Sequence, residues 1–192
     1  LLRTPLVMEG GCIEVDGRGT AIVTESCVLN DNRNAGLGKL AVEAELKRIF
    51  RLSHIIWLPG IKGRDITDGH TDFYARFASP GVILAGFDPD PQSYDHAVTK
   101  AHLQILRNAK DAQGKKLEVM VMRAPDAFNT KYDAATFAAG YIGFYLCNGA
   151  VIAQKFGVAK ADRAARTLLQ QVFPGRVVEQ LRMDAIAAGG GS

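Results

Sequence analysis

The chain has 192 residues, of which 47% are apolar, so it can bury a substantial core as one domain covering residues 1–192. The formal net charge is only +3 and the basic residues are spread among acidic ones, which argues against a nucleic-acid partner. The apolar runs are too short to cross a bilayer and no secretory leader opens the chain, so we expect neither membrane association nor export.

Residues 9–58 contain the first of three similar predicted units, each made of a strand pair, a helix and a further strand. Strands are predicted at 12–15 and 20–24, on either side of the turn Asp16-Gly17-Arg18-Gly19. One apolar side over residues 40–50 predicts a helix. A strand at 54–58 closes the unit and is stopped by Pro59-Gly60.

The second and third units, at 70–122 and 141–181, repeat this order. In the second, we predict strands at 72–77, 82–87 and 117–122, with a helix between the last two that runs from Tyr94, capped by Ser93, to about Ala112. In the third, strands at 142–146 and 150–155 flank the turn Asn148-Gly149, and a helix at 160–172 and a strand at 177–181 follow.

The repetition indicates an α/β protein in which small sheets and helices are arranged around an axis. A single unit of this kind cannot cover its own apolar face, so neighbouring units must cover it. Three units would form an open arc of a larger ring. An ordinary open α/β sheet is the alternative that the pattern leaves open.

The three cysteines, Cys12, Cys27 and Cys147, have no CxxC spacing. This argues against a disulfide framework and against a zinc site. Each lies in an apolar context, so we expect reduced, buried thiols and a cytoplasmic protein.

The densest polar cluster is the segment 64–72, in the loop between the first two units. If Asp72 opens a strand, the two-residue period places His70 and Asp72 on the same side, where an imidazole beside a carboxylate can transfer protons. The plain structural alternative is a turn stabilised by Asp and Thr side chains. A metal site formed by the aspartates and the histidine of residues 65–72 is a further alternative.

The second polar cluster is Glu9-Gly10-Gly11, a carboxylate followed by two glycines. The glycines indicate a place where the backbone approaches another group closely. A glycine bulge beside a surface acid is the alternative without function.

Taken together, these clusters make the chain resemble the agmatine deiminases of the bacterial peptidyl-arginine deiminase family, within the guanidine-modifying superfamily. The matching segments follow the family order and span the chain: 9–11, 30–34, 68–77, 144–151, 173–176 and 187–191. The resemblance implies a pentein-type five-bladed α/β-propeller, of which the three predicted units would be about three blades.

The resemblance also implies roles for three residues. Asp72 would bind the substrate guanidinium, since a charged, delocalised group must be held by carboxylates. His70 would protonate the departing ammonia and then activate water, and Glu9 would orient His70. The nucleophilic cysteine of the family is expected after Ser192 and a second guanidinium-binding aspartate before Leu1, so the 192 residues alone are expected to be inactive.

The implied reaction is the hydrolysis of agmatine to N-carbamoylputrescine and ammonia, a step of polyamine and putrescine synthesis that needs no cofactor and no metal. Ile66 and Gly143 depart from the pattern of many agmatine deiminases, so a peptidyl-arginine deiminase is one alternative. A non-catalytic module that binds cations through Asp72 and Glu9 is another, and a metal hydrolase at 65–72 is a third. The partner is expected to be a small guanidino compound. Open sheet edges would further favour a homo-oligomer or association with the missing segments.

Overall fold

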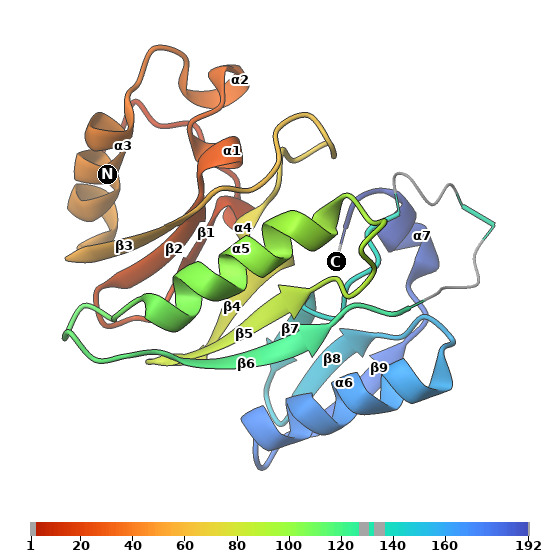
Figure 1. Ribbon diagram of the computed structural model, residues 1–192. Helices are drawn as coiled ribbons and strands as arrows, with labels where there is room; N and C mark the ends of the chain where they lie inside the picture. Colours follow the sequence, from red (N-terminus) through yellow and green to blue (C-terminus); the bar gives the residue numbers. More distant parts are fainter. Residues whose placement is uncertain (1–2, 127–130, 133–136, 192) are drawn as a thin grey trace.

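The computed structural model describes residues 3–126, 131–132 and 137–191. They form three separate three-stranded sheets, in the orders β1-β2-β3, β4-β5-β6 and β7-β8-β9. In each sheet an antiparallel pair is followed by a parallel third strand, and a helix crosses over between the two parallel strands (Figure 1). The predicted α/β class and the threefold order of strands and helices are confirmed.

The first sheet contains β1 (Ile13–Val15), β2 (Thr20–Thr24) and β3 (His54–Leu58), with α3 (Lys39–Phe50) as its crossover helix. Its tight turn forms because the Asp16 carboxylate accepts the N–H groups of Arg18 and Thr20, at 2.7 and 2.9 Å. Gly17 and Gly19 adopt the positive φ angles that this turn requires. The predicted strands therefore match to within one residue.

The second sheet contains β4 (Ala75–Ser79), β5 (Val82–Phe87) and β6 (Glu118–Arg123), with α5 (Asp95–Asn108) crossing over. The helix ends four residues before the predicted Ala112. The Asp111 carboxylate accepts the N–H groups of Gln113 and Lys115 and so stabilises a turn instead of a further helical turn. The helix begins at Asp95 with Tyr94 as its N-cap, one residue later than predicted, although the Ser93 hydroxyl still accepts the N–H of Asp95.

The third sheet contains β7 (Phe144–Cys147), β8 (Ala150–Gln154) and β9 (Val177–Leu181), with α6 (Ala159–Val172) crossing over. The first of these strands begins two residues later than predicted, because the pairing register starts at Phe144 opposite Ala153. A further helix, α7 (Asp184–Ala188), leads to the last glycines of the chain.

Four short helical segments besides α7, which was likewise not predicted, lie in the first two units. They are η1 (Gly10–Cys12), a 3-10 turn, and the single-turn helices α1 (Glu25–Val28), α2 (Asp31–Asn34) and α4 (Thr71–Tyr74). Each lies in a polar or glycine-containing stretch that is too short to show helical periodicity.

The middle strands alternate between two cores. On β2, Ala21 and Val23 pack against α3, whereas Ile22 faces the second unit and joins the cluster that contains Leu103 and Leu106 of α5. On β5, Ile83 and Ala85 face α5 in the same way, and Leu84 joins the cluster of the third unit. Each of these two sheets is therefore covered by its own helix on one face and by the next unit on the other.

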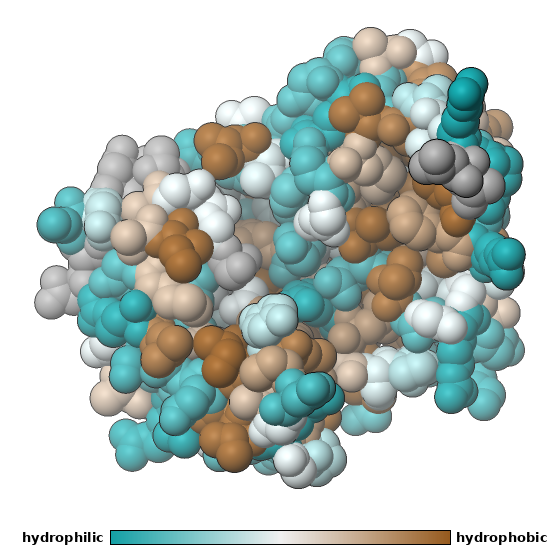
Figure 2. Space-filling view, turned by 180° about the vertical axis from the view of Figure 1, so that it is seen from behind, coloured by the Kyte–Doolittle hydropathy of each residue, from teal (hydrophilic) through white to brown (hydrophobic). Residues whose placement is uncertain are grey.

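Polar side chains also connect the first strands of the three units. The Glu14 carboxylate on β1 accepts from Arg76 Nε at 3.0 Å and from the Phe77 N–H at 3.3 Å, both on β4. Arg76 in turn donates to the carbonyl of Phe144 on β7 and stacks over its ring. Hydrophobic and hydrophilic residues are interspersed over the surface (Figure 2), and among the described residues no helix is both long and apolar enough to span a bilayer.

Candidate active site

His70 and Asp72 of the 64–72 cluster lie at the start of α4 and not on a strand. His70 is the N-cap of α4 and Asp72 is its second residue, so the predicted strand at 72–77 is wrong at its first three positions. The Thr71 side chain explains the turn: it is fully buried, donates to the Cys12 carbonyl at 2.8 Å and accepts the Thr24 N–H at 3.1 Å. These two bonds hold α4 against the first unit.

Glu9 and His70, which are 61 positions apart in the sequence, form a direct pair. His70 Nε2 lies 3.0 Å from Glu9 Oε2. The two glycines after Glu9 form η1, and a Cβ atom added to Gly11 would fall 2.3 Å from His70 Nδ1 and 2.9 Å from Asp72 Oδ1. The close approach predicted at the glycine pair is thus present at Gly11, and the groups approached are His70 and Asp72.

Two further residues reach the same carboxylate without having been expected from the sequence. Arg33 Nε lies 2.9 and 3.0 Å from the two oxygens of Glu9, and its side chain is only 7% exposed. Cys12 Sγ lies 2.9 Å from Glu9 Oε2 and 3.2 Å from Cys27 Sγ. All three cysteines are free thiols, as expected, and Cys12 and Cys27 are buried in the core of the first unit beside the site. The expected burial is wrong for Cys147, which is only partly buried at the end of β7. Arg33 and Glu9 are 24 positions apart, so no local sequence pattern predicts their contact.

The electrostatics of the pair favour a charged histidine beside a charged glutamate. Burial alone would raise the pKa of Glu9, but hydrogen bonds from Cys12, His70 and Arg33 lower it to about 2. The pKa of His70 is raised to about 9 by its hydrogen bonds to Cys12 and Glu9, against the lowering effect of burial. The pKa of Cys12 is raised by its contact with Cys27 and by burial.

Asp72 is a half-buried carboxylate, and the two cationic side chains near it, His70 and Arg76, form their ion pairs with Glu9 and Glu14. Burial raises its pKa, and the charges of His70 and Arg76 offset only part of that effect. A cation that entered beside Asp72 would stabilise the ionised form. The site is therefore electrostatically suited to a positively charged ligand.

His70 and Asp72 line a cavity of about 670 Å³, a size typical of small-molecule sites. The residues that line it come from the loop before α4, from α4, from residues 137 and 138, and from the chain end: Gly63, Arg64, Asp65, Ile66, Thr67, His70, Asp72, Phe73, Tyr94, Phe137, Ala138, Ala188, Gly189, Gly190 and Gly191. The segment after α7 thus shares this cavity with the candidate catalytic residues.

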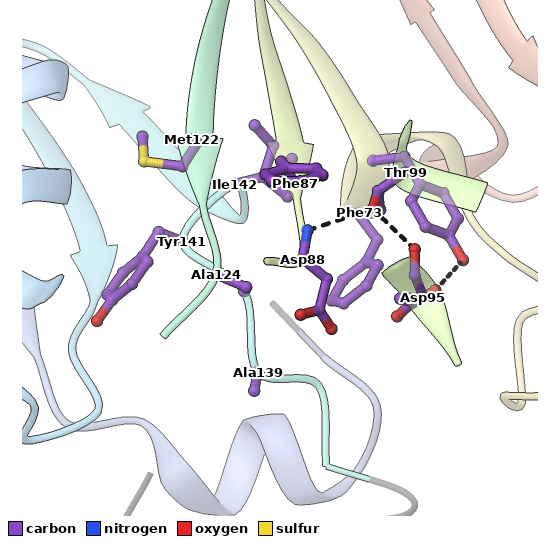
Figure 3. A pocket seen from close by; sticks show the side chains of 13 residues that line it. Phe73, Phe87, Asp88, Asp95, Thr99, Met122, Ala124, Ala139, Tyr141 and Ile142 are labelled. Atoms are coloured by element: carbon purple, nitrogen blue, oxygen red, sulfur yellow. Dashed lines mark hydrogen bonds between the residues drawn. The ribbon is translucent and has the colours of Figure 1, made fainter. Parts of the chain in front are cut away.

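The next two residues of α4, Phe73 and Tyr74, pack behind Asp72. Phe73 lies beside a void of about 30 Å³, and Asp95 accepts the Tyr74 hydroxyl at 3.0 Å (Figure 3). Thr99 connects these residues to the loop after β5, because its hydroxyl donates to the Asp95 carbonyl at 2.7 Å and accepts the Asp88 N–H at 3.2 Å. Burial raises the pKa of Asp95 to about 6.

The other aspartates of the cluster stabilise the loop. Asp68, which has a positive φ of 58°, accepts from the Gly63 N–H at 2.7 Å, from Asn32 Nδ2 at 2.8 Å and from Arg33 Nη1 at 3.2 Å. Asp65 accepts the N–H of Thr67 at 2.6 Å. The turn interpretation therefore describes these two residues, and their carboxylates are not gathered with His70 as a ligand set. Within the described ranges, the side chains that could hold a metal ion are instead Glu9, Cys12, Cys27 and His70.

The whole chain, residues 1–192, matches the family model of Porphyromonas-type peptidyl-arginine deiminase. It is 34% identical to the agmatine deiminase of Pseudomonas fluorescens, with 97% of this chain and 55% of that protein covered, and 36% identical to that of Medicago truncatula, with 88% and 50% covered. A structure of the agmatine deiminase of Enterococcus faecalis superimposes with a TM-score of 0.89 at 28% identity, over 99% of this chain and 56% of that one. The chain thus spans about half the length of the relatives that it matches. By sequence and by fold, it belongs to the Porphyromonas-type peptidyl-arginine deiminase family.

Proposed function

We propose that this chain supplies the acid/base and guanidinium-binding groups of a hydrolase that removes ammonia from agmatine. The observation that carries the proposal is that His70 and the half-buried Asp72 line one cavity of suitable size, with Glu9 3.0 Å from His70. The names of the relatives point to agmatine, and the site supports a guanidino substrate for physical reasons of its own.

Asp72 is the group that binds the guanidinium in this proposal. Burial removes hydration from the Asp72 carboxylate. A planar cation with parallel N–H donors replaces that lost hydration with two hydrogen bonds and an opposite charge. A neutral amide or urea offers donors without the charge. This difference favours substrate over the ureido product.

His70 is the proton carrier. A thiolate adds to the guanidinium carbon, the protonated imidazole gives its proton to the leaving nitrogen, and ammonia departs. The neutral imidazole then takes a proton from the water that attacks the thiouronium carbon, and the thiolate leaves with the product ureido group formed. Glu9 fixes the ring through Nε2 and stabilises its charged form. In the net reaction, agmatine and water give N-carbamoylputrescine and ammonia.

The attacking thiolate is assigned to none of the three cysteines of this chain. Cys12 and Cys27 lie behind Glu9 in the buried cluster, and Cys147 lies on β7. The described lining of the cavity includes no cysteine but does include Gly189–Gly191, the segment after which the family resemblance places the nucleophile. Asp65, also in the lining, is the residue we propose to face the amino end of agmatine.

The proposal is tested by ammonia release from agmatine, with arginine and a peptidyl arginine compared, using the protein expressed from its complete natural reading frame. His70→Asn should lower kcat by roughly 10²- to 10⁴-fold, and Asp72→Asn should mainly raise KM. His54→Asn, on the exposed start of β3, is the matched control and should keep full activity. Agmatine binding without ammonia release would support the cation-binding module instead, and activity that survives His70→Asn would overturn the assignment of His70 as the proton carrier.

A further inference from the structure

We propose that Glu9, Cys12, Cys27 and His70 form a binding site for one zinc ion, which occupies the catalytic histidine and thereby inhibits the enzyme. The site is inferred from the cluster geometry and its ligand chemistry, and it does not depend on which substrate is turned over. It reverses the expectation from sequence spacing that the cysteines form no zinc site.

The ligand atoms are already gathered. One atom from each of the four side chains lies within 4.8 Å of the other three. The closest pairs are Cys12 Sγ to Glu9 Oε2 at 2.9 Å, His70 Nε2 to Glu9 Oε2 at 3.0 Å and Cys12 Sγ to Cys27 Sγ at 3.2 Å. Ligand atoms around tetrahedral zinc lie roughly 3.3–3.8 Å apart, given bonds of about 2.0–2.3 Å. Shifts of a few tenths of an ångström up to about an ångström therefore convert the cluster into a coordination shell.

The backbone supports this arrangement from two rigid positions. Cys12 ends η1 and Cys27 lies in α1, and both side chains are fully buried in the same core. Glu9 is the mobile and accessible member, with a side chain that is 48% exposed, and His70 is 19% exposed. An ion can thus enter past Glu9 and reach two thiols that cannot move away.

The ligand types select zinc among common divalent cations. Two thiolates, an imidazole and a carboxylate match the mixed sulfur, nitrogen and oxygen sets that hold Zn²⁺, whereas Mg²⁺ and Ca²⁺ take oxygen ligands. Two thiolates and one carboxylate exceed the charge of the ion by one negative charge. Arg33, at 2.9–3.0 Å from both Glu9 oxygens, supplies the compensating positive charge.

Zinc binding would block catalysis directly. The Nε2 atom of His70 that meets Glu9 would coordinate the ion and hold the ring as neutral imidazole with its proton on Nδ1, so the ring could no longer alternate between the imidazolium that protonates ammonia and the imidazole that accepts a proton from water. Inhibition would therefore be reversed by chelator and would not be relieved by more agmatine.

The experiment is a titration of the reduced 192-residue chain with Co²⁺, whose absorption reports thiolate ligands, followed by displacement with Zn²⁺ and by elemental analysis after dialysis. We expect one ion per chain, a cobalt–thiolate band, and no competition from excess Mg²⁺. Cys12→Ser and Cys27→Ser should weaken Zn²⁺ binding by more than the roughly 10- to 100-fold that loss of an outer partner costs. Cys147→Ser removes a thiol outside the cluster and should bind zinc like the parent chain.

Circular dichroism of each variant distinguishes lost ligation from lost folding, and the parent titration is decisive by itself. The proposal is overturned if the parent chain shows no cobalt–thiolate band, or if Cys147→Ser weakens binding as much as Cys12→Ser does. Co²⁺ that binds without a thiolate band, at more than one ion per chain, would indicate surface sites and would equally contradict it. A failed agmatine assay would leave this result unaffected, because the metal readout does not use turnover.

Discussion

Gly11 offers a sharp test of the site, because it is the backbone position that His70 and Asp72 approach most closely. In Gly11→Ala the added Cβ would start 2.3 Å from His70 Nδ1, which is 0.7 Å inside the 3.0 Å that real Cβ atoms essentially always keep. The imidazole is the movable partner. A displacement of about 0.7 Å is enough to break a hydrogen bond that now spans 3.0 Å between His70 Nε2 and Glu9 Oε2.

The expected cost has two parts. Overpacking of a well-packed position destabilises by about 1–3 kcal/mol, which urea denaturation of the chain would measure. Misplacement of a catalytic group by about 1 Å costs on the order of 10²-fold in rate, which ammonia release by the complete protein would measure. Gly10→Ala is the matched control, since its added Cβ would meet no atom within 4 Å.

The reasoning fails if Gly11→Ala and Gly10→Ala unfold at the same urea concentration and release ammonia at the same rate. That result would mean that the imidazole does not lie against Gly11. A stability loss without a loss of activity would show that the ring relocates and still reaches the substrate.

The remaining predictions concern the supports of the fold. Burial lowers the pKa of His102 from 6.5 to about 4, so at this residue the unfolded chain binds more protons in that interval. The stability of the parent chain to urea, measured relative to His102→Gln, should therefore fall by about 3 kcal/mol from pH 6.5 to 4. Asp162 accepts the Tyr141 hydroxyl and two backbone N–H groups, so Asp162→Ala should cost about 3 kcal/mol or more in urea denaturation and Asp162→Asn clearly less. Thr71→Val should cost about 2–3 kcal/mol because it leaves the Cys12 carbonyl and a buried N–H unpaired, whereas Thr71→Ser, which keeps both bonds, should stay within about 1 kcal/mol by the same measurement.

Local turn chemistry explains why the strand pairs could be predicted from the sequence. The turns at Asp16-Gly17 and Asn148-Gly149 have side chains that favour one backbone geometry, and successive apolar residues of β2 join different cores. The short helices could not be predicted in this way. Thr71 starts α4 because its hydroxyl finds two partners in the first unit, and that contact exists only in the folded chain.

The candidate site likewise combines residues that local sequence patterns predict with residues that only the fold brings together. Its predicted members, Glu9, His70 and Asp72, belong to compact local patterns, and the structure brings them together. Arg33 reaches Glu9, and Cys27 reaches Cys12, only through tertiary packing, whereas Cys12 contacts Glu9 within the 3-10 turn η1. The one available signal is that Cys12 follows the glycine pair directly. Its apolar sequence neighbours outweigh that signal, because they favour a small buried hydrophobe at this position.

The sharing of cores between consecutive units has a consequence for how the chain unfolds. Ile22 of the first unit is buried among residues of the second, and Leu84 of the second among those of the third, so loss of any one unit exposes apolar surface of its neighbour. The bonds from Arg76 to Glu14 and to Phe144 would break in the same event. Repeat arrays whose units are intrinsically stable can melt from their ends. In this chain the interfaces carry packing in addition to the cores inside the units, so its described part should lose its structure in a single cooperative transition.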